Sequence, residues 1–322
     1  MTININERNI KLWSTIGPRA SIGLAMLEFV KTNSDLMVLT CDVSTSAGLD
    51  RFRKLHPENY VDLGIAEQNM IGVAAGLASE DFKVVTTTFA PFQTMRCCEQ
   101  IKVNFGYMKN KVCMIGIASG LVLGTLGYTH CCIEDIGVMR SIPGMKIISP
   151  ADSLETIKAL DEAIKSNDAI YLRLTGGANN PVIYNKDYKF EIGKSILLKE
   201  GRDVVIFSCG AMVNNCLEAA KILEAKNIST RVINMHTIKP VDKQAIEEAC
   251  KTKMLVSVEE HNVIGGLGSA IAEYKSTLKT STKQLLIGID DCYSEGGNYS
   301  FLKDLHGLSP KKIADKISTN LI

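Results

Sequence analysis

Several features that would place a protein in a membrane or outside the cell are missing from this sequence of 322 residues. No stretch of about 18 apolar residues is present, so no membrane span is expected. The N-terminal residues are polar and mixed in charge, and they lack the apolar core of a signal peptide. Without a secretion signal, the ten cysteines are expected to be free thiols in a reducing cytoplasm.

An excess of either charge is also missing. Lys and Arg number 36 against 35 for Asp and Glu, which leaves a formal net charge of +1. This balance gives no electrostatic reason to expect nucleic acid or an anionic membrane as a partner. With 46% hydrophobic residues the composition is that of a globular chain, and 322 residues predict about two domains.

Metal-binding cysteine patterns are missing as well. No Cys-x-x-Cys is present, and the adjacent pairs Cys97-Cys98 and Cys131-Cys132 suit neither a zinc site nor an ordinary disulfide. The cluster His130-Cys131-Cys132 contains metal-ligating residue types, but no second ligand pair follows at metal spacing. Buried, soft side chains are the favoured interpretation, and the sequence predicts no metal site in this chain.

What is present is an alternation of short apolar runs with amphipathic segments of helical length. Several runs are continuously apolar, which is typical of parallel strands covered on both faces. Predicted strands span residues 36–40, 60–63, 84–88, 112–117, 146–148 and 170–174. Predicted helices span residues 21–31, 66–78, 94–107, 134–141 and 153–165, the last capped by Asp152.

A change of character after residue 174 marks a domain boundary, because the segment from Gly176 to Pro181 interrupts regular structure. A second series follows, with predicted strands at 204–208, 230–234, 254–258 and 285–289, and helices at 213–226, 242–250, 267–276 and 310–317. We therefore predict two α/β domains with mainly parallel sheets. The expected parts are an N-terminal tail (1–12), a first domain (13–178), a linker (179–194) and a second domain (195–322).

Sites in open α/β sheets lie at the carboxyl ends of the strands. The predicted strand 60–63 is followed by Gly64-Ile65-Ala66-Glu67-Gln68-Asn69-Met70, which opens a helix rich in Gly and Ala. In the first turn of this helix, Glu67 would complement the helix dipole. A carboxylate beside a buried helix would alternatively exchange a proton with a ligand nitrogen. Composition alone leaves both interpretations of Glu67 open.

A set of short segments surrounds Glu67 in a definite order along the chain. They are Asp42-Val43-Ser44-Thr45-Ser46, Gly64 to Met70, Thr88-Phe89-Ala90-Pro91-Phe92, Gly127-Tyr128-Thr129-His130, Glu134-Asp135, Arg140-Ser141-Ile142-Pro143, Ser149-Pro150-Ala151-Asp152, Val258-Glu259-Glu260-His261 and Gly265-Gly266-Leu267-Gly268. Together they resemble the transketolase family, in particular the C-terminal subunit of a split, two-chain transketolase. That subunit consists of a pyrimidine-binding domain followed by a transketolase C-terminal domain. Each segment is weak alone, whereas the ordered set is specific.

The resemblance implies a transferase that moves a two-carbon ketol unit from a ketose donor to an aldose acceptor, with thiamine diphosphate as cofactor. It implies that Glu67 bonds the ring nitrogen of the aminopyrimidine and acts as the acid–base partner of the cofactor. His130 matches a catalytic histidine that contacts the substrate near the reacting carbonyl.

The resemblance also assigns residues that bind the cofactor and the substrate. Phe89 and Phe92 would form the aromatic pocket for the pyrimidine, with Met95 where the family often has Tyr. Asp42 would lie near the cofactor, and Val43 would be the apolar wedge that bends it. Arg19 matches an arginine that binds the substrate phosphate, and Ser46 matches a neighbouring hydroxyl contact. From the residues alone, core packing explains the phenylalanines equally well.

One signature of the family is missing. No Gly-Asp-Gly with a distant Asn is present, and the glycines at 265–268 are better explained as a tight turn that opens a helix. The metal, Mg²⁺ or Ca²⁺, and the diphosphate would then be held by a partner, an N-terminal transketolase subunit. An α2β2 heterotetramer in which this chain also self-associates is expected, active only as the complex.

The predicted substrate end departs from the family. Ala118 and Gly176 stand where many transketolases have phosphate-binding His and Arg, and Leu126 stands where they have an Asp that contacts a sugar hydroxyl. Each lost charge-assisted contact costs about 1.5–3 kcal/mol. A sulfonated sugar or an unusual phosphosugar is therefore the expected substrate.

Three alternatives remain. Two are other thiamine-diphosphate enzymes, a deoxyxylulose-phosphate synthase-like enzyme or the β-subunit of a 2-oxoacid dehydrogenase. The pair Thr129-His130 and the run from Glu134 to Pro143 favour a transketolase over the dehydrogenase subunit. The third is a non-catalytic regulatory subunit, against which the retention of Glu67 with the two phenylalanines argues.

Overall fold

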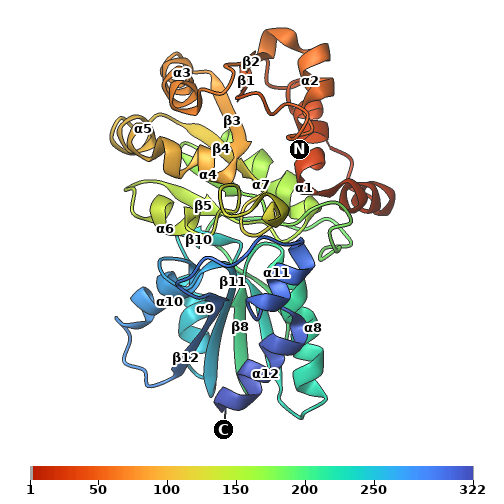
Figure 1. Ribbon diagram of the computed structural model, residues 1–322, viewed down its shortest axis with the longest axis vertical. Helices are drawn as coiled ribbons and strands as arrows, with labels where there is room; N and C mark the ends of the chain where they lie inside the picture. The colour runs from red at the N-terminus through yellow and green to blue at the C-terminus, as the bar shows by residue number, and fades with distance from the viewer. Residues whose placement is uncertain (1–2, 322) are drawn as a thin grey trace.

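Two α/β domains are stacked along the long axis of the molecule, as Figure 1 shows for this computed structural model. The structure describes residues 3–321. The predicted fold class, two α/β domains with mainly parallel sheets, is confirmed. The bounds predicted for the tail, the linker and the domains stay a prediction.

The sheet of the first domain has seven strands in the order β10-β5-β6-β4-β3-β1-β2. All neighbours pair in parallel except β10 with β5. The strands are β1 Leu36–Thr40, β2 Tyr60–Asp62, β3 Lys83–Phe89, β4 Val112–Ile117, β5 Lys146–Ile148, β6 Ile170–Arg173 and β10 Thr237–Lys239. The carboxyl ends of β1 to β6 therefore meet at one edge, where sites are expected in this class of sheet.

Helices cover both faces of this sheet, as continuously apolar strands require. One buried cluster joins the sheet to α1, α2 and α7, and another joins it to α3, α5 and α6. The helices are α1 Glu7–Phe29, α2 Asp50–Leu55, α3 Glu67–Ser79, α4 Ala90–Gln93, α5 Cys98–Ile101, α6 Asp135–Arg140 and α7 Ser153–Lys165, with short turns η1 Pro57–Asn59, η2 Met95–Cys97, η3 Lys102–Tyr107 and η4 Gly124–Leu126. The predicted cap of α7 is present, since Asp152 accepts a hydrogen bond of 2.8 Å from the Glu155 N–H.

The first helix begins earlier than the sequence predicts, inside the segment expected to be a tail. Asn6 caps it by accepting a hydrogen bond from the Asn9 N–H at 2.9 Å. Ile10 and Trp13 are buried, so this part of the chain belongs to the core of the first domain. A kink at Gly17, whose φ is 82°, precedes Pro18 and ends the regular hydrogen bonding.

The helix predicted over residues 94–107 is interrupted. Cys97 departs from helical geometry, with φ at −108° and ψ at 10°, and upstream of it the Thr94 hydroxyl donates to the Ala90 carbonyl at 2.7 Å. The segment is therefore divided among η2, α5 and η3, and the separate helix α4 precedes it. This interruption positions residue 96, which lies in η2, for the site described below.

The second domain has a five-stranded sheet in the order β12-β11-β8-β9-β7, parallel except for β7. Its strands are β7 Ile196–Lys199, β8 Val204–Ser208, β9 Thr230–Asn234, β11 Met254–Asn262 and β12 Lys283–Ile289, and its helices are α8 Met212–Glu224, α9 Lys243–Ala249, α10 Leu267–Lys275, α11 Tyr299–Leu305 and α12 Pro310–Leu321. The structure adds α2, α4, β7, β10 and α11 to the predicted helices and strands. All five are short and carry little periodicity.

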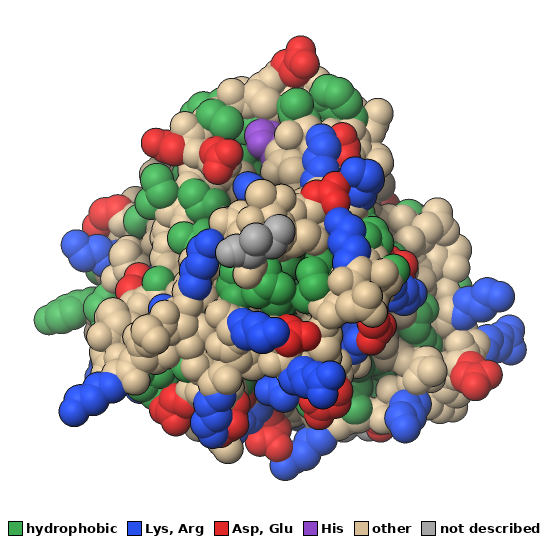
Figure 2. Space-filling model, turned by 90° about the horizontal axis from the view of Figure 1, so that it is seen from below, with side chains coloured by type: hydrophobic (Ala, Val, Ile, Leu, Met, Phe, Trp, Pro, Cys, Tyr) green, Lys and Arg blue, Asp and Glu red, His purple; other side chains and the backbone are tan. Residues whose placement is uncertain are grey.

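Strand β10 connects the two domains, because it follows β9 in the chain but pairs with β5 of the first sheet (Figure 1). The segment 179–194 before β7 is irregular, yet Tyr184 and Phe190 are buried in it. On the face at the end of the second domain, positive and negative side chains are interspersed (Figure 2). Within residues 3–321, no helix combines the length and hydropathy needed to cross a bilayer.

Candidate active site

The candidate site lies at the carboxyl edge of the first sheet. Glu67 opens α3 just after β2, and Phe89 ends β3. Because Thr40 of β1 pairs with both Asp62 and Thr87, the ends of β1, β2 and β3 are level. The residues after these three ends are therefore brought together although they lie far apart in the sequence.

Glu67 is buried in a manner that is unusual for a carboxylate, with only 4% of the residue exposed. Its Oε2 accepts a hydrogen bond from Nη1 of Arg96 at 2.9 Å. Its Oε1 accepts no hydrogen bond from residues 3–321. The main chain of Arg96 is fixed by Gln68, whose amide donates to the Arg96 carbonyl at 3.1 Å.

Sulfur-containing side chains surround the Glu67 carboxylate. Burial, with a contribution from the Glu67 charge, raises the pKa of the Cys41 thiol to about 11 and that of the Cys97 thiol to about 12. The Cys41 thiol lies 3.6 Å from the sulfur of Met70. Both thiols therefore stay neutral at physiological pH.

An aromatic cluster stands beside Glu67. The ring centroids of Phe89 and Phe92 lie 6.3 Å apart in an edge-on arrangement, and the His130 ring lies 6.2 Å from the first and 5.5 Å from the second. The guanidinium of Arg96 lies over the Phe92 ring, 4.0 Å from its centroid. A carboxylate, two phenyl rings and an imidazole, all predicted from the sequence, thus form one group joined by Arg96.

The other residues predicted to bind the cofactor surround this group less closely. Asp42 is exposed and left-handed, with φ at 55°, and its N–H donates to Asp62 Oδ1 at 2.9 Å. Val43 is buried behind it. Met95 is exposed in the turn η2. The structure therefore places these three at the same edge without assigning their function.

The predicted substrate residues lie at the same end of the first domain but on other segments. Arg19 follows the kink of α1, is partly buried, and forms no ion pair within residues 3–321. Burial lowers the pKa of its guanidinium. The kink packs on the segment after β6, because a Cβ at Gly17 would collide with the Gly177 carbonyl. Ser46 is exposed in the loop after β1.

The three positions that depart from the family differ in their surroundings. Ala118 is buried directly after β4 in a left-handed conformation, with φ at 54°. Gly176 is also left-handed, with φ at 79°, and Leu126 is exposed in η4. None of them offers a charged group, in agreement with the substitutions seen in the sequence.

The loop that carries His130 is held by the second domain. Glu260, at the end of β11, accepts a hydrogen bond from the Leu121 N–H at 2.7 Å and another from the Tyr299 hydroxyl at 2.5 Å. Farther along, the Tyr128 hydroxyl lies 3.0 Å from both Ser294 and His306. The second domain therefore fixes the backbone that presents His130.

A buried polar network joins the two domains beneath this loop. Asp135 Oδ2 accepts hydrogen bonds from Arg173 Nε at 2.8 Å and from the Tyr171 hydroxyl at 2.6 Å. Burial opposes the charge of Arg173, but the Asp135 carboxylate outweighs it and raises the guanidinium pKa. Arg173 also donates to the Glu260 carbonyl at 2.9 Å. A single buried arginine thus bonds both domains.

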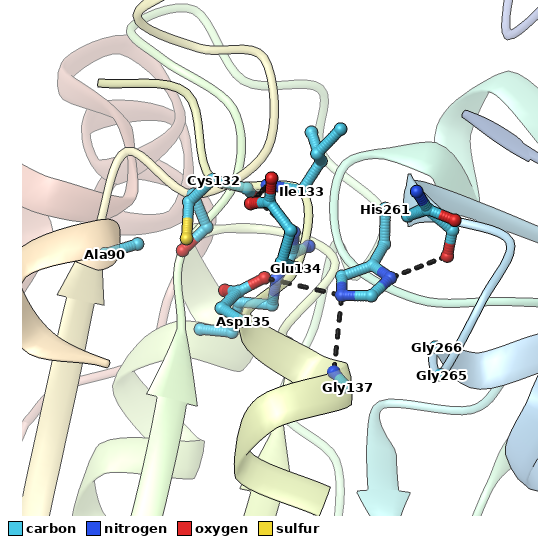
Figure 3. A network of polar contacts seen from close by, with 12 residues as sticks. Ala90, Cys132, Ile133, Glu134, Asp135, Gly137, His261, Gly265 and Gly266 are labelled. Atoms are coloured by element: carbon cyan, nitrogen blue, oxygen red, sulfur yellow. Dashed lines mark hydrogen bonds and ion pairs between the residues drawn. The ribbon is translucent and has the colours of Figure 1, made fainter. Parts of the chain in front are cut away.

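His261 lies at the same junction and faces Asp135, as Figure 3 shows. Its Nε2 accepts a hydrogen bond from the Gly137 N–H at 3.4 Å, so Nδ1 is the protonated nitrogen and donates to the Asn262 carbonyl at 2.7 Å. Burial lowers its pKa to about 4. The imidazole is therefore neutral at physiological pH and serves the junction rather than the candidate site.

Sequence reasoning missed Arg96, Glu260 and Tyr299. Arg96 had a local signal, since it lies four residues after Phe92, one helical turn away. Glu260 lies in the motif Val258-Glu259-Glu260-His261, but neither that motif nor any pattern around Tyr299 indicated their contacts, which join residues separated by 139 and 39 positions.

The fold and this group of side chains define the class of protein: a two-domain α/β chain with a buried carboxylate and an aromatic cluster at the carboxyl edge of its first, mainly parallel sheet. The sequence matches the family described as transketolase, pyrimidine binding domain, over residues 14–180, and the transketolase C-terminal domain over residues 193–313. The chain belongs to the transketolase family, as the ordered motifs indicate.

Individual relatives of this chain support the same family assignment. A 6-deoxy-6-sulfo-D-fructose transketolase subunit from Clostridium sp. is 35% identical over 89% of this chain and 89% of its own length. One of the subunits of the apulose-4-phosphate transketolase from Phocaeicola vulgatus is 35% identical over 92% of this chain and 95% of its own length. A solved structure of a split-gene transketolase, described as an inactive beta4 tetramer, superposes with a TM-score of 0.85 at 34% identity, covering 95% of this chain and 98% of that one. These two relatives and this solved structure, each similar to the chain over nearly its whole length, are named as transketolase subunits or as a split-gene transketolase.

Proposed function

We propose that this chain is the pyrimidine-side subunit of a thiamine-diphosphate-dependent transketolase that transfers a two-carbon ketol unit from a ketose to an aldose. The observation that carries the proposal is the buried Glu67 carboxylate beside the Phe89–Phe92–His130 cluster. A carboxylate that is 4% exposed but whose Oε1 has no partner within residues 3–321 is suited to a ligand nitrogen.

The residues present fit an aminopyrimidine. Phe89 and Phe92 offer an apolar ring surface, and Glu67 offers a fixed acceptor at its edge. When bound, thiamine diphosphate would supply a nucleophilic carbon and a cationic thiazolium ring that can take up the electrons of the transferred fragment. In this arrangement Glu67 holds or shares the proton at the ring nitrogen of the pyrimidine. Asp42, Val43 and Met95 would complete the pocket.

His130 is the proposed catalytic residue toward the substrate. Its ring is held edge-on by the two phenylalanines, and its Nδ1 lies 3.0 Å from the Thr129 hydroxyl, so Nε2 remains for the substrate. Arg19, which forms no ion pair within residues 3–321, would bind an anionic group of the substrate, with Ser46 beside it. Rigid support of these side chains lowers the cost of orienting the substrate.

The substrate is proposed to be a non-standard sugar. Ala118, Leu126 and Gly176 replace charged contacts of many transketolases, and similar chains are named for a sulfonated fructose and for apulose 4-phosphate. A sulfonate and a phosphate both offer oxygens to an arginine, so Arg19 fits either.

The diphosphate and its metal, Mg²⁺ or Ca²⁺, are proposed to be held by a separate N-terminal transketolase subunit, in a cytoplasmic α2β2 assembly. The exposed side of α3 supports an interface with another chain. Gly72 and Gly76 lie one turn apart on it, and a Cβ at either would meet nothing within 4 Å. Such a surface allows close approach of a second helix.

Co-expression tests the proposed function. The partner is sought as a chain with Gly-Asp-Gly and a downstream Asn, encoded beside this one, and the purified complex is assayed with sulfonated and phosphorylated ketose donors. Ketol transfer that requires added thiamine diphosphate and divalent metal is expected. Turnover of pyruvate instead of ketoses would contradict the transketolase assignment. Efficiency on xylulose 5-phosphate and ribose 5-phosphate equal to that of a standard transketolase would contradict the non-standard substrate.

A further inference from the structure

Arg96 makes two contacts in the candidate site that no motif assigns to it. Its guanidinium lies 4.0 Å from the centroid of the Phe92 ring, and its Nη1 donates to Glu67 Oε2 at 2.9 Å. The guanidinium is planar, cationic and rich in N–H donors. It therefore uses both elements of the site, an aromatic face and a carboxylate edge.

An aminopyrimidine needs the same two elements. Its ring would lie against Phe92, and its nitrogen would bond the Glu67 carboxylate, as the proposed function requires. The Arg96 guanidinium covers one face of the Phe92 ring, so an aminopyrimidine that lies on that face and bonds Glu67 has to displace it. We propose that Arg96 occupies the pyrimidine site of the free chain as a stand-in for the aminopyrimidine, and that cofactor binding displaces it. This inference rests on the proposed function.

The surroundings of Arg96 allow the displacement. Its side chain is 42% exposed, so the guanidinium can move into solvent, whereas the Glu67 side chain, 4% exposed, stays in place. Gln68 fixes the main chain of Arg96, so only the side chain needs to rotate. Glu67 is the one carboxylate paired with Arg96 among residues 3–321. Such a half-exposed pair is weak enough to be replaced by a ligand.

Arg96 would also protect the site before assembly. With the guanidinium in place, the buried carboxylate of Glu67 is paired rather than left as an isolated charge. Removing Arg96 should therefore free the site for the cofactor and leave Glu67 unpaired in the free chain. The two effects are measured separately.

The first measurement concerns the chain alone. A double-mutant cycle with Glu67→Gln, Arg96→Met and the double variant, in urea unfolding at pH 7, should show a coupling of about fivefold in the unfolding constant, or about 1 kcal/mol. Additive effects of the two substitutions would show that the pair does not form, and would overturn the inference whether or not the chain has the proposed function.

The second measurement concerns the complex. Calorimetric titration of the cofactor-free complex with thiamine diphosphate and Mg²⁺ should show Arg96→Met binding about three- to tenfold more tightly than the wild type. Arg96→Lys, which keeps the charge but loses the planar group, should fall between them. Arg53→Met is the matched control, because Arg53 is 43% exposed and also pairs with a carboxylate, that of Asp50, at 3.2 Å. It should bind like the wild type.

Unchanged or weaker binding of thiamine diphosphate by Arg96→Met would overturn the proposed displacement. If Arg96 competes with the cofactor, its removal has to tighten cofactor binding. A wild-type complex that binds no thiamine diphosphate would instead overturn the proposed function, and the displacement with it. A positive cycle in the free chain together with tighter binding in the complex is the result expected.

Discussion

The two polar groups of this chain, the candidate site and the domain junction, differ in how far the chain itself completes them. At the junction, Arg173 is 1% exposed and bonds Asp135 of the first domain and Glu260 of the second. At the site, Glu67 is equally well covered from behind, but its partner Arg96 is half-exposed and its Oε1 has no partner within residues 3–321.

The difference separates a structural group from one prepared for a ligand. The Asp135 carboxylate is fully buried between Arg173 and His261, and its Oδ1, which has no hydrogen-bond donor within residues 3–321, faces Nε2 of His261 at 3.8 Å. A carboxylate that is rigid yet incompletely bonded lowers the cost of binding, because the protein has already ordered it. The junction therefore holds the domains together, whereas the candidate site is proposed to be completed by groups from outside the chain.

The largest effect on stability should come from breaking the junction. Arg173→Met leaves Asp135 buried without its cation, and we expect a loss of about 3–5 kcal/mol in the free energy of unfolding. Urea unfolding followed by circular dichroism measures it. Arg53→Met removes an exposed pair and should cost at most about 1 kcal/mol. A cost that small for Arg173→Met would contradict a structural role of the junction.

The junction should also respond to acid. Because the pKa of His261 is about 4 in the folded chain and near 6.5 when unfolded, the unfolded chain binds the proton first as pH falls. The stability that neutral His261 contributes is complete above pH 6.5 and is lost as pH falls toward 4, by up to about 3 kcal/mol.

The variant His261→Gln isolates the contribution of His261 to the pH dependence of the unfolding free energy. The difference in unfolding free energy between wild type and variant should be constant from pH 8 to 7 and should decrease from pH 6.5 to 4. Its value at pH 8 measures the packing cost of the substitution alone. A difference that is independent of pH throughout would contradict the neutral, buried imidazole.

The smallest effect on stability is expected from substitutions on the exposed side of α3. Gly72→Ala should stabilise the free chain by about 0.5–1 kcal/mol, because the added methyl meets nothing within 4 Å and a helical Gly is flexible when unfolded. If α3 packs closely against another chain, the same methyl should weaken assembly, measured by sedimentation. Gly76→Ala is the parallel variant. Assembly unaffected by both would place the interface elsewhere.

Much of this molecule was predictable from the sequence. Strands such as β1, β4 and β8 have the predicted bounds, because a buried parallel strand is continuously apolar. Glu67, Phe89 and Phe92 follow strand ends, so the topology alone brings them together. Their chemical roles depended on the ordered motifs, since a carboxylate in the first helical turn has an ordinary structural explanation.

The features that the sequence did not predict depend mostly on contacts between segments that are distant in the chain. Strand β10 was missed because three residues that pair across the domain boundary carry no periodic pattern of their own. The non-helical geometry of Cys97 divided a predicted helix and left Arg96 in the short turn η2. The support of the His130 loop by Glu260 joins residues far apart in the chain and left no local signal.

The most direct test of the central claim is Glu67→Gln in the complex with the partner subunit. The amide keeps the shape of the side chain but cannot exchange a proton with the pyrimidine, so ketol transfer should fall by about 100-fold or more while the subunits still co-purify. Glu80→Gln, on an exposed residue at the end of α3, should keep full activity. A Glu67→Gln complex that transfers the ketol unit at the wild-type rate would contradict catalysis through this chain.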